Sequence, residues 1–281
     1  MPDLPCKDCG LPVPLGRSDC PHCGRPSLFP NVQAAELDGE QSALAARYRA
    51  AIEDAESRGC GEVLRAFESA AGAAQAVLTR PFADVERLAS SDRQLQPTYY
   101  QLLEAEARLP YGDRWDKLRR LADAALFPGY EKDIRFAALS LDGTGLPSYG
   151  ECSLVLREDM IAHRASVFDE NSALLMERWA YNPPMGLRAV WQARALLCVA
   201  KLAGELRPDT QEEEFAKLLL SPGTDPENDC FVEVHIWGSM SGWTLERVVF
   251  TPAAGNRPPP KYVVKGLRAE LAKFDIELEE R

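Results

Sequence analysis

Residues 231–237 read Phe-Val-Glu-Val-His-Ile-Trp, and their side chains alternate in character. Val232, Val234 and Ile236 fall on one side of an extended chain, whereas Glu233 and His235 fall on the other. A period of two is typical of a β-strand with one face in the core. The stretch therefore predicts a sheet strand that buries one face and presents an acid and a histidine together on the other.

Other segments of the C-terminal half repeat this pattern or replace it with a helical one. Residues 152–157 alternate in the same way, residues 135–141 form a short run typical of a buried strand that Asp142-Gly143 closes, and residues 245–250 are expected to form a partner strand. Helices are expected at 187–206, at 211–220 and at 264–274, the last one after Pro258-Pro259-Pro260. Strands mixed with helices predict an α+β domain over residues 130–281.

Residues 31–129 predict a helical middle segment. Apolar residues recur there at three and four positions, as in Leu44, Tyr48 and Ile52 and again in residues 63–71, with a break at Gly59–Gly61. A further helix is expected from Pro97 through Leu109, and another from a cap at Asp113 to about Phe127.

The first 30 residues form a separate module that carries two Cys-x-x-Cys pairs. The pairs are Cys6 with Cys9 and Cys20 with Cys23, and ten residues separate them. Four thiolates suit a tetrahedral Zn²⁺ and leave no position open for water, so we expect a structural zinc ribbon. His22 could replace a thiolate, although a solvent-facing turn residue is the simpler interpretation. The acidic and basic residues of the segment balance, which favours protein docking over nucleic-acid binding.

Composition limits the remaining possibilities. The 281 residues are 46% hydrophobic and 27% charged, which predicts a folded chain. The formal net charge of −11 disfavours a general phosphate-coating role, so nucleic acid is a possible but not a favoured partner. No run is long and apolar enough to span a membrane, and the first residues lack the features of a signal peptide. Eight cysteines with four near the N-terminus indicate metal binding in a reducing, cytoplasmic location.

Several short motifs lie on or beside the predicted C-terminal strands, in a definite order along the chain. They are Tyr149-Gly150 before a strand, Arg164-Ala165-Ser166, Asn171-Ser172 and Glu233-Val-His235-Ile-Trp-Gly238. This order resembles bacterial ADP-ribosyltransferase-like domains over roughly residues 134–250. In a related group of uncharacterised bacterial proteins, the corresponding strand carries Glu-x-Gln-x-x-Gly.

The resemblance implies a function and a set of site residues. It implies an NAD⁺-dependent transferase, either a toxin or an anti-phage defence effector, in which Glu233 is the catalytic carboxylate and His235 its partner on the strand. A carboxylate near the nicotinamide ribose would stabilise the positive charge that develops there. Arg164 or Arg135 would hold the cofactor, Ser166 would support the glutamate, and Tyr149 would stack on nicotinamide. Ser140 and Ser172 are secondary candidates. The common signature has Gln or Glu where this chain has Phe231, so the resemblance carries over no acceptor.

Two other functions remain open from the sequence. The chain could be a non-enzymatic zinc-ribbon module whose helical middle binds a protein partner, with Glu233 as an ordinary paired acid on a strand. It could also be a nucleic-acid-directed enzyme that uses the ribbon as a clamp, which would need a basic stripe. The transferase function predicts that Glu233, Arg164 and Ser166 converge around a cleft, whereas the interaction module predicts that they are dispersed.

Overall fold

A mixed 8-stranded sheet forms the centre of the molecule in the computed structural model, which describes residues 4–6, 8–14, 17, 19–25, 29–104, 114–225, 227–252 and 259–281. The strand order is β10-β9-β5-β3-β4-β8-β6-β7, and the β10–β9 pair is parallel whereas the other neighbours are antiparallel. The strands are β3 (Gln75–Arg80), β4 (Ile134–Ser140), β5 (Cys152–Leu156), β6 (Ala165–Phe168), β7 (Arg188–Val190), β8 (Glu233–Trp237), β9 (Leu245–Phe250) and β10 (Glu277–Glu280).

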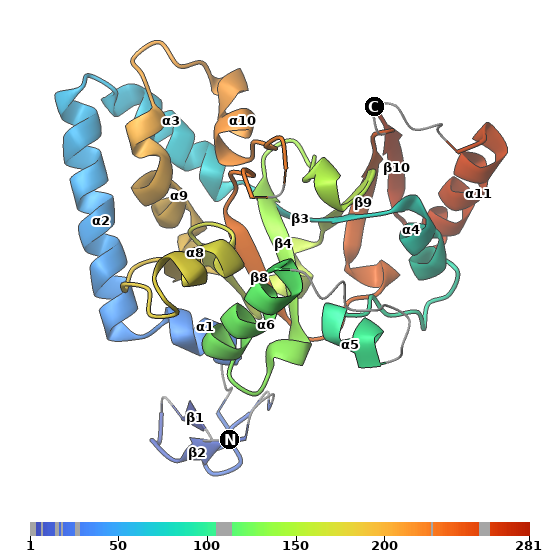
Figure 1. Ribbon diagram of the computed structural model, residues 1–281, viewed down its shortest axis with the longest axis horizontal. Helices are drawn as coiled ribbons and strands as arrows, with labels where there is room; N and C mark the ends of the chain where they lie inside the picture. The colour runs from blue at the N-terminus through green and yellow to red at the C-terminus, as the bar shows by residue number, and fades with distance from the viewer. Residues whose placement is uncertain are drawn as a thin grey trace.

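Helices surround this sheet, and a small hairpin lies apart from it near the N-terminus (Figure 1). The hairpin pairs β1 (Leu4–Pro5) with β2 (Pro12–Val13). The helices are α1 (Pro30–Ala35), α2 (Asp38–Ser57), α3 (Gly61–Gly72), α4 (Phe82–Ala89), α5 (Tyr99–Glu104), α6 (Arg114–Leu126), α7 (Glu158–Ile161), α8 (Ser172–Arg178), α9 (Arg194–Leu202), α10 (Phe215–Leu219) and α11 (Lys261–Ala272). Short 3₁₀ turns add η1 (Glu131–Asp133), η2 (Pro147–Tyr149), η3 (Trp191–Ala193), η4 (Ala203–Glu205), η5 (Glu212–Glu214) and η6 (Gly242–Thr244). No helix among the described residues combines the length and apolarity that a membrane crossing needs.

One face of the sheet carries the main hydrophobic core. Alternate strand residues such as Leu139, Leu154, Val234 and Val248 are almost fully buried and pack with apolar side chains of α2, α3, α9, α4 and α11. A buried Leu or Val side chain contributes about 1.5–3 kcal/mol relative to an exposed one. This face therefore fixes which strand residues point the other way, toward α6 and α8.

The opposite face is more polar and is covered in part by α6 and α8. Register places Phe136 of β4 beside His235 of β8, and Phe168 of β6 beside Glu233. Phe168 packs there with apolar residues of α6 and α8 in a second, smaller core. The acid and the histidine expected on one strand face thus lie under helices and not in bulk solvent.

The predicted strands agree with β4, β5, β8 and β9, whereas the other four strands of this sheet and the β1–β2 hairpin were not predicted. One of them, β3, belongs to the predicted helical middle and lies between β4 and β5. Residues 31–129 and 130–281 therefore share one sheet. The predicted helix at 187–206 was wrong at its start, because Arg188–Val190 forms β7 against β6 and α9 begins only at Arg194. Leu109, Asp113 and Pro258, which marked predicted helix boundaries, lie outside the described residues.

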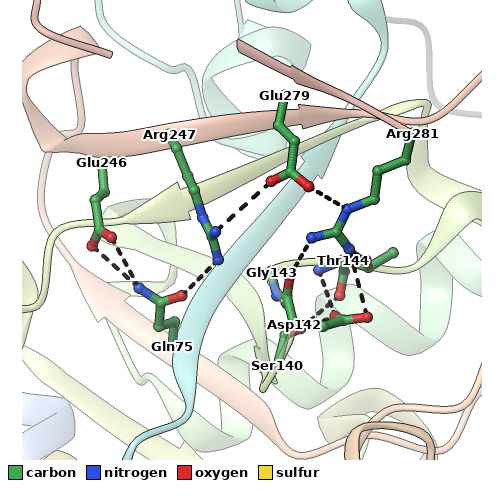
Figure 2. Close-up of polar contacts among 9 residues, drawn as sticks. All are labelled: Gln75, Ser140, Asp142, Gly143, Thr144, Glu246, Arg247, Glu279 and Arg281. Carbon is green, nitrogen blue, oxygen red and sulfur yellow. Dashed lines mark hydrogen bonds and ion pairs between the residues drawn. The ribbon is translucent and has the colours of Figure 1, made fainter. Parts of the chain in front are cut away.

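A polar network ties the C-terminal strand to the rest of the sheet (Figure 2). Arg247 donates to Gln75 Oε1 at 3.1 Å and lies 3.8 Å from Glu279. Arg281 donates to Asp142 O at 2.9 Å, in the turn that follows β4. These contacts lie on the face where Val77, Val155 and Val249 form a small buried cluster. The network therefore fastens β10 and the turn after β4 to each other.

Gly143 in this turn is expected to tolerate no side chain. Its φ is +79°, and an added Cβ would lie 2.6 Å from Arg247 Nη2. The left-handed region costs an L-residue about 1–2 kcal/mol, so we expect Gly143→Ala to lower the free energy of unfolding by at least that amount in urea denaturation. Gly266→Ala is the matched control, because no atom lies within 4 Å of its added Cβ in α11. That change should raise stability by about 0.5–1 kcal/mol, and equal effects of the two changes would contradict the prediction.

Candidate functional site

A cavity of about 560 Å³ opens on the polar face of the sheet, between β3, β4, β8 and the helices α5 and α6. Its volume is in the range of small-molecule binding sites. Aromatic side chains form much of the wall, namely Tyr99, Tyr100, Trp115, Phe136 and Tyr149. Charged side chains line it as well, which makes it the strongest candidate site in the described part of the chain.

Glu233 lines this cavity and is only 2% exposed. Its Oε2 accepts hydrogen bonds from the Ser172 backbone N–H at 2.9 Å and from His235 Nε2–H at 3.0 Å. Its Oε1 lies 3.6 Å from Arg119 Nη2. Burial by itself raises the pKa of Glu233, but the Arg119 charge and the two hydrogen bonds outweigh it and lower that pKa to about 2. The carboxylate is therefore ionised at neutral pH.

Asp123 provides a second carboxylate in the same cavity. Its Oδ2 accepts a hydrogen bond from the Tyr100 hydroxyl at 2.9 Å, and its Oδ1 lies 3.5 Å from Arg119 Nη1. Burial raises the pKa of Asp123 to about 6, although Arg119 and Tyr100 act in the opposite direction. Two carboxylates on one guanidinium thus have pKa values on either side of the usual carboxyl range, an arrangement typical of acid–base sites.

Arg119 connects the two acids. Besides facing both of them, it donates to Ser172 Oγ at 3.1 Å, and its guanidinium carbon lies 4.4 Å from the centre of the Phe136 ring. The stacking and the hydrogen bonds hold the planar guanidinium in one orientation. Because Arg119 is in α6 and Glu233 in β8, this contact also joins the helical middle of the chain to the sheet.

His235 lies behind Glu233 and does not line the cavity among the described residues. The rings of Phe127, Phe136 and Phe168 surround it, with centroids 4.9, 5.4 and 5.5 Å away. Burial lowers its pKa even though Glu233 acts to raise it. The neutral imidazole therefore orients the carboxylate and is shielded from a ligand.

The other residues predicted for the site are divided between the cavity and its surroundings. Tyr149 and Arg135 line the cavity. The Arg135 guanidinium donates to the carbonyls of Gln96 at 2.9 Å and Gly238 at 2.6 Å, so it holds two loops together.

Arg164, Ser166 and Ser140 are not among the described residues that line the cavity. Arg164 donates to the backbone carbonyls of Trp237 and Ser239. Ser166 accepts from Asn31 Nδ2 at 3.3 Å, and Ser140 accepts the Gly143 N–H in the turn after β4. Glu233, Arg164 and Ser166 therefore do not converge on one cleft.

Arg119, Asp123 and Tyr100 line the cavity but were not predicted from the sequence. All three come from the segment predicted as a separate helical part, and Glu233, which pairs with Arg119, is more than a hundred residues away in the chain. The only sequence signal is the spacing of four between Arg119 and Asp123, which is usually found on solvated helix faces. Only the packing of α6 on the sheet shows that this pair is buried.

The four cysteines of the N-terminal module form a second site. The Sγ atoms of Cys6, Cys9, Cys20 and Cys23 all lie within 4.8 Å of one another. The distances Cys6–Cys23 and Cys9–Cys20 are both 3.7 Å. A tetrahedral ion with metal–sulfur bonds of about 2.3 Å would separate its ligands by about 3.8 Å, so this cluster could hold a metal ion.

We expect Arg119→Gln to destabilise the fold strongly. The change leaves Glu233 and Asp123 buried without their cation, which typically costs about 3–5 kcal/mol. Arg114→Gln is the matched control on the same helix, since Arg114 is 56% exposed and pairs with Glu177 and Glu227 at the surface. An exposed pair is worth at most about 1 kcal/mol. Urea unfolding at pH 7 compares them, and similar losses for both variants would show that Arg119 is not the cation that the buried acids require.

No protein-family model matches the chain, and no match was found among curated proteins. The comparisons therefore show no family, and they give the resemblance to ADP-ribosyltransferases no support. The cavity and the cysteine cluster are the observations from which a function can be inferred.

Proposed function

We propose that the chain is an NAD⁺-dependent ADP-ribosyltransferase that binds NAD⁺ in the cavity between α6 and the sheet. The observation that carries this proposal is Glu233, an ionised carboxylate held by three partners in the lining of a cavity with aromatic walls. Cleavage of the nicotinamide–ribose bond develops positive charge on the sugar, and a fixed carboxylate stabilises such a charge.

The residues around Glu233 support such a role. Ser172 and His235 hold one carboxylate oxygen, which leaves the other on the Arg119 side, toward the cavity. Tyr149 is 42% exposed and lines the cavity, so its ring offers a surface on which a planar group can stack. A carboxylate that is already oriented needs no reorganisation when the charge develops.

Two observations favour a different function. Glu233, Arg164 and Ser166 do not converge on one cleft, as the transferase function would require. The guanidinium groups of Arg135 and Arg164 are engaged by backbone carbonyls, and neither is the cation that a diphosphate would need. We therefore keep a non-enzymatic interaction module as the second candidate, in which the Glu233–Arg119–Asp123 cluster stabilises the packing of α6 on the sheet. The two candidates differ in one measurable property, turnover of NAD⁺.

We expect the purified chain to release nicotinamide from NAD⁺, and Glu233→Gln to lower this rate by at least about 10²-fold, since the substitution removes a preorganised charge. Glu246→Gln is the control, because Glu246 contacts Gln75 at the surface outside the cavity. Circular dichroism verifies that each variant folds. A wild-type chain that leaves NAD⁺ intact, with cell lysate supplied as acceptor, would contradict the proposal and favour the interaction module.

We also propose that the cysteine cluster binds structural zinc and serves as a docking module for a protein partner. Four thiolates at tetrahedral spacing suit Zn²⁺ and leave no open coordination position. Arg17 lies 3.5 Å from Asp19, and Arg25 lies 3.8 Å from Asp8, so the charges of the segment are largely matched within it. Nucleic-acid binding needs Lys and Arg side chains that can neutralise phosphates, so matched charges support protein docking more than nucleic-acid binding.

We expect one zinc ion per chain by atomic absorption. Cys9→Ser should abolish this stoichiometric zinc, because the site loses one of its four thiolates. Cys230→Ser is the control, as Cys230 is an exposed thiol outside the cluster and should leave zinc content unchanged. Zinc retained in Cys9→Ser at the wild-type level would rule out the four-thiolate site.

A further inference from the structure

We propose that Tyr100 and Asp123 form a proton relay in the cavity, which accepts the proton of the group that attacks the ribose. This inference rests on the proposed function, because it names the proton acceptor of that reaction. The Tyr100 hydroxyl donates to Asp123 Oδ2 at 2.9 Å, and both residues line the cavity with Glu233.

Exposure assigns the two residues different tasks. Asp123 is 0% exposed, whereas Tyr100, which donates to it, is half-buried. A ligand would therefore contact the Tyr100 hydroxyl, and Asp123 would act through it. Tyr100 is the candidate catalytic residue of the pair, and Asp123 is its positioning residue and proton store.

The proton balance of the reaction requires such an acceptor. When a hydroxyl or water attacks the ribose carbon, the bond to nicotinamide breaks and nicotinamide leaves as a neutral molecule with the bonding electron pair. The attacking oxygen loses one proton. Tyr100 would take that proton as its own hydroxyl proton passes to Asp123, so the phenol is regenerated and Asp123 becomes a neutral acid. Nicotinamide, the ribosylated product and the protonated Asp123 then account for all atoms and charges.

The charged surroundings suit this division between the two acids. Burial raises the pKa of Asp123 to about 6, and the Glu233 charge also raises it. The Arg119 charge and the Tyr100 hydrogen bond lower it. The charge of Glu131 in η1 raises the pKa of Tyr100, and Tyr149 of η2 raises the pKa of Arg119. His235 is hydrogen-bonded to Glu233. Burial and the Asp123 charge raise the pKa of Tyr100, which disfavours a free phenolate and favours a concerted transfer. Glu233, whose pKa is about 2, stays ionised throughout and is not the proton acceptor.

The test is the pH profile of nicotinamide release from NAD⁺. The relay needs ionised Asp123, so kcat/KM of the wild type should fall about tenfold per pH unit below pH 6. Asp123→Asn and Tyr100→Phe should each lose about 10²-fold or more at pH 7.5 and should lack this acidic limb. Tyr100→Phe keeps the ring and its packing, so it preserves the test if Asp123→Asn does not fold.

Glu68→Gln is the matched control for these variants. Glu68 accepts a hydrogen bond from the Tyr48 hydroxyl at 2.6 Å, a second tyrosine–carboxylate pair, and neither residue lines the cavity. The pH profile of nicotinamide release by Glu68→Gln should equal that of the wild type. Folded Asp123→Asn or Tyr100→Phe variants that keep the wild-type rate and acidic limb would overturn the relay and leave the proposed function intact. A wild type that releases no nicotinamide at any pH would overturn the proposed function and the relay with it.

Discussion

The contact of Arg119 with Glu233 and Asp123 is the interaction on which the rest of the polar face depends. Two buried acids cannot stay ionised close together without a cation between them, because each is desolvated and each repels the other. Arg119 faces both at about 3.5 Å and is held in place by Ser172 and the Phe136 ring. The Arg119 guanidinium lowers the pKa of both acids, and the raised pKa of Asp123 comes from its burial.

The second constraint is the position of β3 in the middle of the sheet. It brings the N-terminal half of the chain between β4 and β5, so the helices around it are continuous with the domain that carries Glu233. Thr79 and Arg80, at the end of β3, line the same cavity as α5 and α6. The cavity thus combines one wall from the helical middle with a floor from the C-terminal strands, and neither segment of the chain contains the site alone.

Prediction from sequence was accurate where a local pattern decides the structure. Period two located β5 and β8, a short buried run located β4, and β9 was predicted as a partner strand. The Cys-x-x-Cys spacing identified four cysteines that do lie together. Prediction was inaccurate where pairing with a distant strand decides the structure. Examples are β3, which lies in an alanine-rich stretch, and β7, which lies at the start of an apolar run. For the cavity, Glu233, Tyr149 and Arg135 were named in advance, whereas Arg164 and Ser166 lie elsewhere and Arg119, Asp123 and Tyr100 were missed.

The sequence by itself determined the four-cysteine cluster that could hold a metal ion, the mixed α+β fold class and the common face of Glu233 and His235, because short spacings and the two-residue period of a strand are local properties. Only the tertiary structure decided which charges are buried together. The pairing of Arg119 with Glu233 depends on how α6 packs on β8, and the raised pKa of Asp123 depends on the desolvation that this packing causes. Burial is a property of the whole fold, so no spacing along the chain encodes it.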